Sequence, residues 1–173
     1  MPKVSNTSSS TPSEQADLSD AKFGVWYDEY RASVLEPALA AGLAALQAAL
    51  HDGLSDRDMS RIRNVSGRVK SKRRTWRKIQ QSQYADTINT TADIPNEILD
   101  LVGLRITCTN LRDIETVQGT LDALSAKQSR NAGLWVDMES DRDYVRMPKE
   151  SGYRGWHVPV WTAIEDNTGS GGG

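Results

Sequence analysis

Apolar residues recur at helical spacing over the N-terminal part of the chain. Phe23 and Tyr27 begin an apolar stripe with steps of three or four residues, and Ser19 stands before them as a helix-capping residue. Pro37 then predicts either a kink or the start of a new helix, because proline is tolerated in a first turn but not in a helix interior. Beyond it, regularly spaced leucines among alanines predict an amphipathic helix that ends near Gly53.

The remainder of the chain alternates between helical and extended patterns. Capping residues and helical spacing predict helices that begin at Ser55 and that span Lys72–Gln83, Asn96–Leu101 and Asp113–Ala126. Apolar, β-branched or alternating segments predict strands over Val65–Val69, Leu104–Thr107, Leu134–Met138, Tyr144–Met147 and Trp156–Thr162. Pro159 places the last strand at a sheet edge or a bulge. The helix over 113–126 has the length of a crossover that returns the chain to the same sheet, so the pattern predicts a mixed α/β fold.

The chain length of 173 residues suits one folded unit rather than two. Residues 1–17 are rich in Ser, Thr, Asn and Pro, so we expect a disordered tail. N-terminal helices over 18–60 then precede an α/β core over 61–166. Residues 167–173 form a Gly/Ser tail, and we expect that the domain does not end naturally there.

The composition argues against membrane-spanning, secreted and zinc-binding proteins. Mean hydropathy is −0.56, and we expect no apolar run of the roughly 20 residues that a membrane span needs. The N-terminus lacks the apolar core of a signal peptide, so a cytoplasmic protein is expected. Cys108 is the single cysteine, and His51 and His157 are the only histidines, which excludes an internal disulfide and a Cys/His zinc site.

Positive charge is concentrated in one segment. The net charge is only −2, yet nine bases and no acid lie between Arg61 and Lys78. Such a concentration in a nearly neutral protein predicts a bound anion.

The segment Gly67–Ser71, which reads Gly-Arg-Val-Lys-Ser, leads from a predicted strand into a basic helix. On that helix Arg73 and Arg77 share a face, so several cations converge on one volume. Arginine grips phosphate oxygens with two donors and lysine supplies a compact charge, which suits a triphosphate. The alternative is a solvated basic helix face, which is what most charge runs are.

The segment Asp100–Ile106, which reads Asp-Leu-Val-Gly-Leu-Arg-Ile, places an acid just before a buried strand and Arg105 within it. A carboxylate there can hold Mg²⁺, which takes one or two carboxylates together with substrate phosphates. The alternative is that Asp100 caps or turns the chain and pairs with Arg105.

A third segment combines Arg142–Tyr144 with Lys149–His157. Ser151 and Gly152 signal a turn, after which Tyr153 offers its ring as a stacking platform for a purine while nearby bases address phosphates. The alternative is a hairpin turn whose aromatic residue only packs.

In this order the three segments resemble the synthetase domain of the RelA/SpoT alarmone family, most closely its small single-domain members. Gly67–Ser71 is similar to the family's Gly-Arg-Val-Lys stretch, and Asp100–Ile106 to its Asp-Ile-Ala-Gly-Leu-Arg. Residues 142–157 are similar to its Arg-Asp-Tyr-Ile followed by Lys-x-Ser-Gly-Tyr-Arg-x-x-His. The similarity spans residues 61 to about 162.

The resemblance implies a nucleotidyltransferase-like fold, in which helices flank a mixed β-sheet, and transfer of pyrophosphate from ATP to the 3′-hydroxyl of GTP or GDP. The product is the alarmone pppGpp or ppGpp. Such transfer depends mainly on positioning and on neutralisation of charge by Mg²⁺ and cations. The roles implied for the matching residues are ATP binding by Arg68, Lys70, Ser71 and Arg77; Mg²⁺ binding and catalysis by Asp100, with Arg105 and His157 as further catalytic residues; and acceptor binding by Lys149, Tyr153 and Arg142.

One family segment has no counterpart in the sequence. The family's later strand, Glu-x-Gln-x-Arg-Thr, carries a second essential acid, and the only acids after His157 are Glu165 and Asp166, which lack its flanking pattern. We therefore expect a C-terminally truncated or degenerate member in which synthesis is impaired.

Two other functions stay open. Some small family members are toxins that place pyrophosphate on the 3′ end of tRNA, and bases such as Arg57, Arg63 and Lys72 suit a tRNA backbone. An antitoxin is then a possible partner. A catalytically dead module that binds a nucleotide or a protein, with the leucine helix as its docking face, is the other alternative, although such stripes are usually core. The oligomeric state stays open, and the two histidines cannot build the His-Asp metal site of a hydrolase domain.

Overall fold

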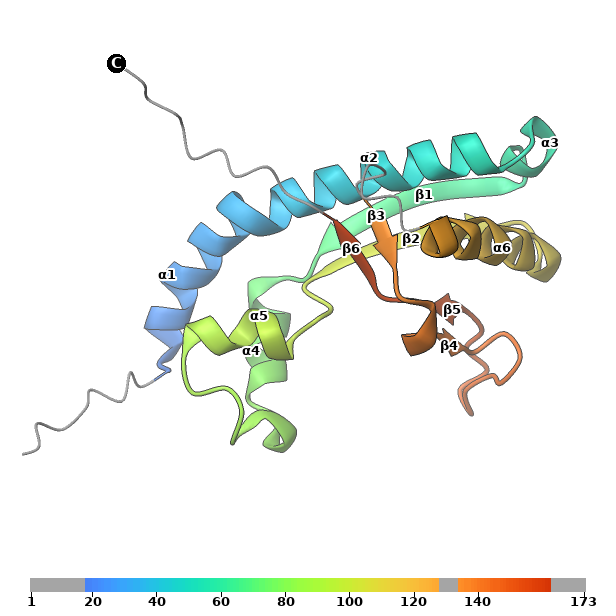
Figure 1. The fold of residues 1–173 in the computed structure, drawn as a ribbon. Helices are drawn as coiled ribbons and strands as arrows, with labels where there is room; N and C mark the ends of the chain where they lie inside the picture. Colours follow the sequence, from blue (N-terminus) through green and yellow to red (C-terminus); the bar gives the residue numbers. More distant parts are fainter. Residues whose placement is uncertain (1–17, 128–133, 163–173) are drawn as a thin grey trace, which may run out of the picture.

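The computed structural model describes residues 18–127 and 134–162. The predicted tails at 1–17 and 167–173, together with Glu165 and Asp166, lie outside the described residues. Within them the fold is of the α/β class, as the sequence predicts: helices surround short antiparallel strands (Figure 1).

A continuous helical rod forms the N-terminal part and runs along one side of the molecule (Figure 1). It consists of α1 (Asp20–Tyr30), a π-helical turn (Arg31–Leu35) and α2 (Glu36–Gly53). The Ser19 side chain accepts a hydrogen bond of 3.3 Å from the Lys22 N–H, which confirms the predicted cap. Pro37 lies in the first turn of α2, directly after the π-helical turn, so a new α-helical segment starts there without a break in the rod.

The helical rod is more apolar than the mean hydropathy of the whole chain predicts. Asp20–Gly53 is long and apolar enough to cross a membrane by length and composition, with a mean hydropathy of 1.4 in its best window, so the expectation of no such run is wrong. The closely spaced Ala and Leu residues of α2 produce this value. A core helix passes the same test, and Leu46 and Leu50 of α2 are buried in a hydrophobic cluster.

Helix α2 packs on a two-stranded antiparallel ribbon of β1 (Ile62–Val69) and β2 (Val102–Cys108). Between α2 and β1, the helix α3 (Asp56–Met59) is capped by Ser55, as predicted. Gly67 of β1 pairs with Leu104 of β2, and a Cβ atom at position 67 would overlap the side chain of Leu39 on α2. A larger residue at position 67 would therefore force the Leu39 side chain to move.

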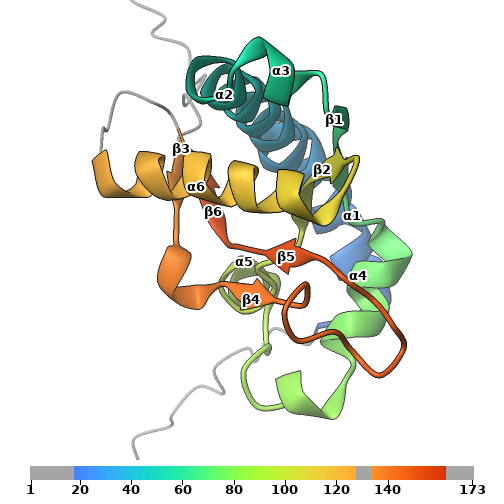
Figure 2. The same cartoon turned by 90° about the vertical axis from the view of Figure 1, so that its right-hand side faces the viewer.

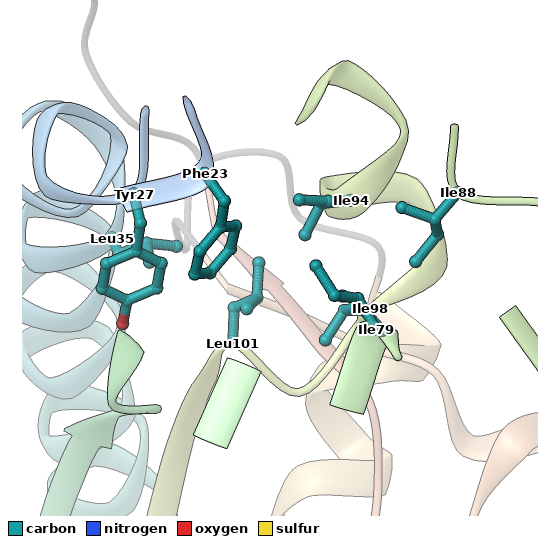
Figure 3. Packing of buried hydrophobic residues seen from close by; sticks show 8 residues of the cluster. All are labelled: Phe23, Tyr27, Leu35, Ile79, Ile88, Ile94, Ile98 and Leu101. Carbon is teal, nitrogen blue, oxygen red and sulfur yellow. The ribbon is translucent and has the colours of Figure 1, made fainter. Parts of the chain in front are cut away.

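The chain between β1 and β2 forms the second helical region. It contains α4 (Lys72–Ile79), 3-10 turns at Ser82–Tyr84 and Thr91–Asp93, and α5 (Ile94–Glu97). Helix α4 ends before the predicted limit at residue 83, and α5 begins two residues earlier than predicted. This region and α1 enclose the first core cluster, whose buried members are shown in Figure 3: Phe23, Tyr27, Leu35, Ile79, Ile88, Ile94, Ile98 and Leu101.

The C-terminal part places a long helix beside two further ladders (Figure 2). Helix α6 (Leu111–Lys127) leads to β3 (Leu134–Val136), a 3-10 turn (Met138–Ser140) and β4 (Arg142–Asp143); β5 (Trp156–His157) and β6 (Val160–Thr162) follow. Strand β3 pairs with β6, and β4 pairs with β5. The second core cluster lies between these elements and α2, with buried Leu46, Leu50, Val117, Leu121, Leu134 and Val136.

Three details of the predicted strands are wrong. Helix α6 does not return the chain to the β1–β2 ribbon, because β3 pairs with β6 in a separate two-stranded ladder. Residues 144–147 form a turn instead of a strand, since the Asp143 carboxylate accepts the backbone N–H groups of Val145 and Arg146 at 2.9 and 3.0 Å. Pro159 lies between β5 and β6 and divides the predicted last strand between two partners.

Candidate functional site

One face of α4 lines an open basic pocket of about 340 Å³ at the end of the β1–β2 ribbon. The lining residues on α4 and just after it recur every three or four positions, so they share one face of the helix. Thr75 and Ile79 lie on the other face and are buried. We call this site the basic pocket; its lining residues are Lys70, Arg74, Arg77, Lys78, Gln81 and Asp100.

Asp100 is the one acid among the residues that line the basic pocket. The Lys70 ammonium group donates to one carboxylate oxygen, and the Lys78 ammonium group lies 2.7 Å from the other. The Asp100 side chain is 57% exposed, while those of the two lysines are 17% and 26% exposed. Partial burial acts to raise the pKa of the Asp100 carboxyl, but the hydrogen bonds and charges of Lys70 and Lys78 outweigh it and lower the pKa below its usual range. The alternative in which Asp100 pairs with Arg105 is wrong.

The structure brings only part of the predicted ATP set into this pocket. Lys70 and Arg77 line it, as does Asp100. Arg68 is exposed on β1, and Ser71 is the exposed N-cap residue of α4, whose side chain makes no capping hydrogen bond. Both therefore lie beside the pocket in the chain without lining it.

Three lining residues have no ATP-binding role in the sequence prediction: Arg74 and Lys78, which belong to the predicted cluster of bases, and Gln81. The predicted face of Arg73 and Arg77 is only half right, because Arg77 lines the pocket and Arg73 does not. The signal was available: positions 74, 77, 78 and 81 follow the i, i+3, i+4, i+7 pattern of one helix face. What sequence could not supply was which face α4 turns inward, because that depends on the burial of Thr75 and Ile79.

A second group of predicted residues gathers around the β4–β5 ladder. We call it the aromatic cluster; it consists of Tyr144, Lys149, Tyr153 and His157. The Tyr153 hydroxyl lies 2.8 Å from Nε2 of His157, and the two rings meet edge to face with centroids 5.7 Å apart. The Lys149 ammonium group lies 4.5 Å from the ring centroid of Tyr144 and 5.8 Å from that of Tyr153. These are cation–π distances, so lysine and the rings form one group.

Two glycines shape the turn that presents Tyr153. Gly152 has a φ of 78°, a conformation that glycine adopts without a steric penalty, and its N–H donates to the Lys149 carbonyl at 2.8 Å. A Cβ atom at Gly155 would lie 2.7 Å from the Tyr153 hydroxyl oxygen. The predicted turn at 151–152 is therefore confirmed, and Gly155 leaves the space into which the tyrosine folds.

His157 lies in a positive environment. Its pKa is lowered below the usual value, first by burial and then by the charges of Lys149, Arg142 and Arg105. Arg142 is opposite His157 in the β4–β5 register, whereas Arg105 lies on β2. The charge of Arg105 is the smallest of these causes.

No group of three or more His, Cys, Asp or Glu side chains that could hold a metal ion occurs in the described part of the chain. Asp100 is the only carboxylate among the residues that line the basic pocket. Any divalent ion there would therefore depend on ligands from a bound substrate in addition to Asp100.

Comparisons with known proteins assign the chain to a family. A family profile described as a region found in RelA / SpoT proteins matches residues 67–170. That range contains all three segments singled out in the sequence. No curated protein sequence matches the chain.

Solved structures show the same fold. The small alarmone synthetase 1 from Bacillus subtilis superposes with a TM-score of 0.60 at 25% identity, over 83% of this chain and 65% of that one. The same enzyme bound to its product pppGpp gives 0.56 at 26% identity, over 78% and 61%. A GTP pyrophosphokinase family protein from Streptococcus pneumoniae gives 0.57 at 24% identity, over 78% and 59%. This chain thus spans about three-fifths of the length of these structures, and by its profile match over residues 67–170 it belongs to the RelA/SpoT family.

Proposed function

We propose that the protein transfers pyrophosphate from ATP to the 3′-hydroxyl of GTP or GDP and so makes the alarmone (p)ppGpp. The observation that carries this proposal is the basic pocket, which four cations line together with the single carboxylate of Asp100. A nucleoside triphosphate is an anion of matching charge and shape for such a set. Membership of the RelA/SpoT family and the pppGpp bound to the Bacillus structure support the same chemistry.

On the ATP side, the lysines exchange partners when the nucleotide binds. Lys70 and Lys78 both contact Asp100, and we expect their ammonium groups to move to phosphate oxygens. Arg74 and Arg77, which line the same pocket, add planar donors for the remaining oxygens. The lysines thereby hold the phosphates close to the carboxylate that they release.

The freed carboxylate fits a Mg²⁺ ion. Mg²⁺ in phosphate sites takes one or two carboxylates, substrate phosphate oxygens and waters, and Asp100 is partly exposed with a lowered pKa, so it is ionised at neutral pH. Bound there, Mg²⁺ would supply neutralisation of the charge that develops on the transferred group. Asp100 is the one carboxylate among the residues that line the basic pocket.

On the acceptor side, the aromatic cluster offers a ring and two polar groups. Tyr153 is 43% exposed and presents a face on which a guanine can stack. Lys149 supplies a cation for the acceptor's phosphates. The lowered pKa of His157 keeps its imidazole neutral at pH 7, so the ring can hold a proton from a neighbouring hydroxyl.

Turnover by this chain is expected to be slow. The basic pocket holds one carboxylate among the described residues, and no segment of the sequence matches the family's second acidic motif. Activation of the acceptor hydroxyl therefore lacks the acid that the resemblance implies.

The test is transfer of label from ATP labelled in its γ-phosphate, with Mg²⁺ and either GDP, GTP or bulk tRNA as acceptor. Label in the guanine nucleotide supports the proposal, and Lys70→Ala and Asp100→Ala abolish it. Lys72→Ala is the matched control, because Lys72 pairs with Asp28 outside the basic pocket. Label in tRNA alone would replace alarmone synthesis by modification of tRNA, and ATP binding without transfer to any acceptor would indicate a nucleotide-binding module.

A further inference from the structure

A buried hydroxyl from the N-terminal helix reaches the chain at the basic pocket. Tyr27 of α1 is 1% exposed and lies in the first core cluster. Its hydroxyl oxygen points out of that cluster (Figure 3) and donates a hydrogen bond to the backbone carbonyl oxygen of Lys70. A phenylalanine would fill the same apolar space, so the hydroxyl adds only its polar contacts, with the Lys70 carbonyl and with the Thr75 side chain on α4.

The Lys70 backbone is held from two sides. Its N–H donates to the Leu101 carbonyl at 2.7 Å, and its own carbonyl accepts the Tyr27 hydroxyl. Leu101 directly follows Asp100, whose carboxylate receives the Lys70 ammonium group. The two backbone contacts therefore fix Lys70 relative to the acid that it pairs with, at the point where β1 ends and α4 begins.

We propose that Tyr27 is a positioning residue for the basic pocket: its hydroxyl fixes the Lys70 backbone so that the lysine side chain is directed at Asp100 and at the phosphates of ATP. This inference rests on the proposed function for the identity of the ligand. It extends the site beyond the segment that the family profile matches, because Tyr27 precedes residue 67. Helix α1 thereby becomes part of the nucleotide-binding machinery as well as a wall of the core.

A second contact between the same elements provides a comparison. Asp28, the next residue of α1, pairs with Lys72 at 2.5 Å, but both side chains are substantially exposed, at 64% and 44%. Exposed ion pairs contribute little because water and salt screen them. The buried Tyr27 hydrogen bond is therefore expected to control the position of Lys70, and the exposed pair is not.

The experiment measures binding of ATP and of GDP to the 173-residue chain and to Tyr27→Phe. We expect ATP to bind about fivefold to tenfold more weakly, which is the scale of one lost hydrogen bond, while GDP binding stays unchanged. Tyr30→Phe and Asp28→Asn are matched controls on the same helix. No hydrogen bond from the Tyr30 hydroxyl is found within the described residues, and its ring stacks on Trp26.

A double-substitution cycle separates positioning from general destabilisation. If Tyr27 acts through Lys70, Tyr27→Phe changes ATP affinity no further in a Lys70→Ala background. Equal weakening in both backgrounds, or a matching loss of GDP binding together with a lower melting temperature, would show a merely structural role and overturn the proposal.

The Lys70 amide gives a readout that does not depend on nucleotide. Because the Tyr27 hydroxyl holds the Lys70 carbonyl while the Lys70 N–H donates to Leu101, loss of the hydroxyl should speed exchange of the Lys70 amide hydrogen with solvent in Tyr27→Phe, which NMR hydrogen exchange detects. Faster exchange in a protein that binds no ATP would keep the positioning role and reject the proposed function. Unchanged exchange, with ATP bound normally, would reject the positioning role alone.

Discussion

The basic pocket and the aromatic cluster differ in what lies beneath them. Ile79 and Leu101, the chain neighbours of Lys78 and Asp100, are buried in the first core cluster. The aromatic cluster instead lies mostly on the turn-rich segment between the two-residue strands β4 and β5, where Met147 is 77% exposed, with His157 on β5 itself. The groups expected to meet ATP thus have buried core residues as chain neighbours. On the acceptor side, the neighbours of His157, Trp156 and Val158, are only partly buried against the second core cluster, and Tyr153 lies in the exposed turn.

This difference in burial indicates which of the two sites has its binding geometry preformed. Charged groups at fixed positions stabilise transferred charge without reorganisation, and a core immediately below them supplies that rigidity. A segment with few buried apolar contacts opens at low free-energy cost and can adapt to what binds it. We expect a preformed pocket for ATP and an acceptor site that becomes ordered on binding.

The largest expected effect is on stability. Ile94→Ala removes a fully buried side chain from the first core cluster and should lower the free energy of unfolding by about 2 to 5 kcal/mol. Met147→Ala in the segment of the aromatic cluster should change it by less than about 0.5 kcal/mol. Urea denaturation of both variants measures the contrast, and similar losses would mean that the two halves are equally supported.

The next effect is on transfer. Asp100→Asn keeps the shape of the side chain but removes the charge that Lys70 and Lys78 contact and that Mg²⁺ would need. We expect the transfer rate to fall by about 100-fold, equivalent to about 2.7 kcal/mol, with the melting temperature nearly unchanged because the side chain is 57% exposed. Radiolabel transfer under single-turnover conditions measures the rate; full activity in Asp100→Asn would remove this residue from the mechanism.

A smaller effect is expected at the acceptor site. Tyr153→Ala removes the exposed ring and should raise the KM for the guanine nucleotide about tenfold, within the range of one base-stacking contact. Tyr153→Phe keeps the ring and loses only the contact with His157, so its KM should stay within about twofold of the unsubstituted chain. Steady-state kinetics with either nucleotide varied measure both KM values. A rise in the KM for ATP instead of the guanine nucleotide would contradict the assignment of the aromatic cluster to the acceptor.

The smallest effect concerns the protonation of His157. Lys149→Gln removes one of the charges that lower its pKa, so the pKa should rise toward the ordinary value of about 6.5. Because the folded-state pKa is lowered, stability falls as pH drops from about 6.5 through that pKa, and the fall should be shallower in Lys149→Gln. An imidazole NMR titration, paired with unfolding at pH 5 and pH 7.5, measures both, and an unchanged titration would place Lys149 too far from the ring.

Local features of the fold are readable from the chain because their causes are local. Ser19 and Ser55 cap the helices that follow them, and Gly152 takes the turn conformation that the dipeptide predicts. Strand pairing was not readable in the same way, since the register and partner of β3 depend on contacts with β6 far along the chain. The turn at residues 144–147 escaped prediction because one carboxylate, that of Asp143, satisfies two backbone groups.

By itself, the sequence determined the family, the mixed α/β class and the three segments that carry the candidate site, because these depend on residue types in a fixed order. Only the tertiary structure decided that Asp100 pairs with Lys70 and Lys78, residues far before it in the chain. It also decided that Arg74 faces the pocket, and that Tyr27 reaches Lys70. These contacts join segments that are brought together only by the packing of the first core cluster. A local sequence pattern does not determine which face of a helix packs against that core.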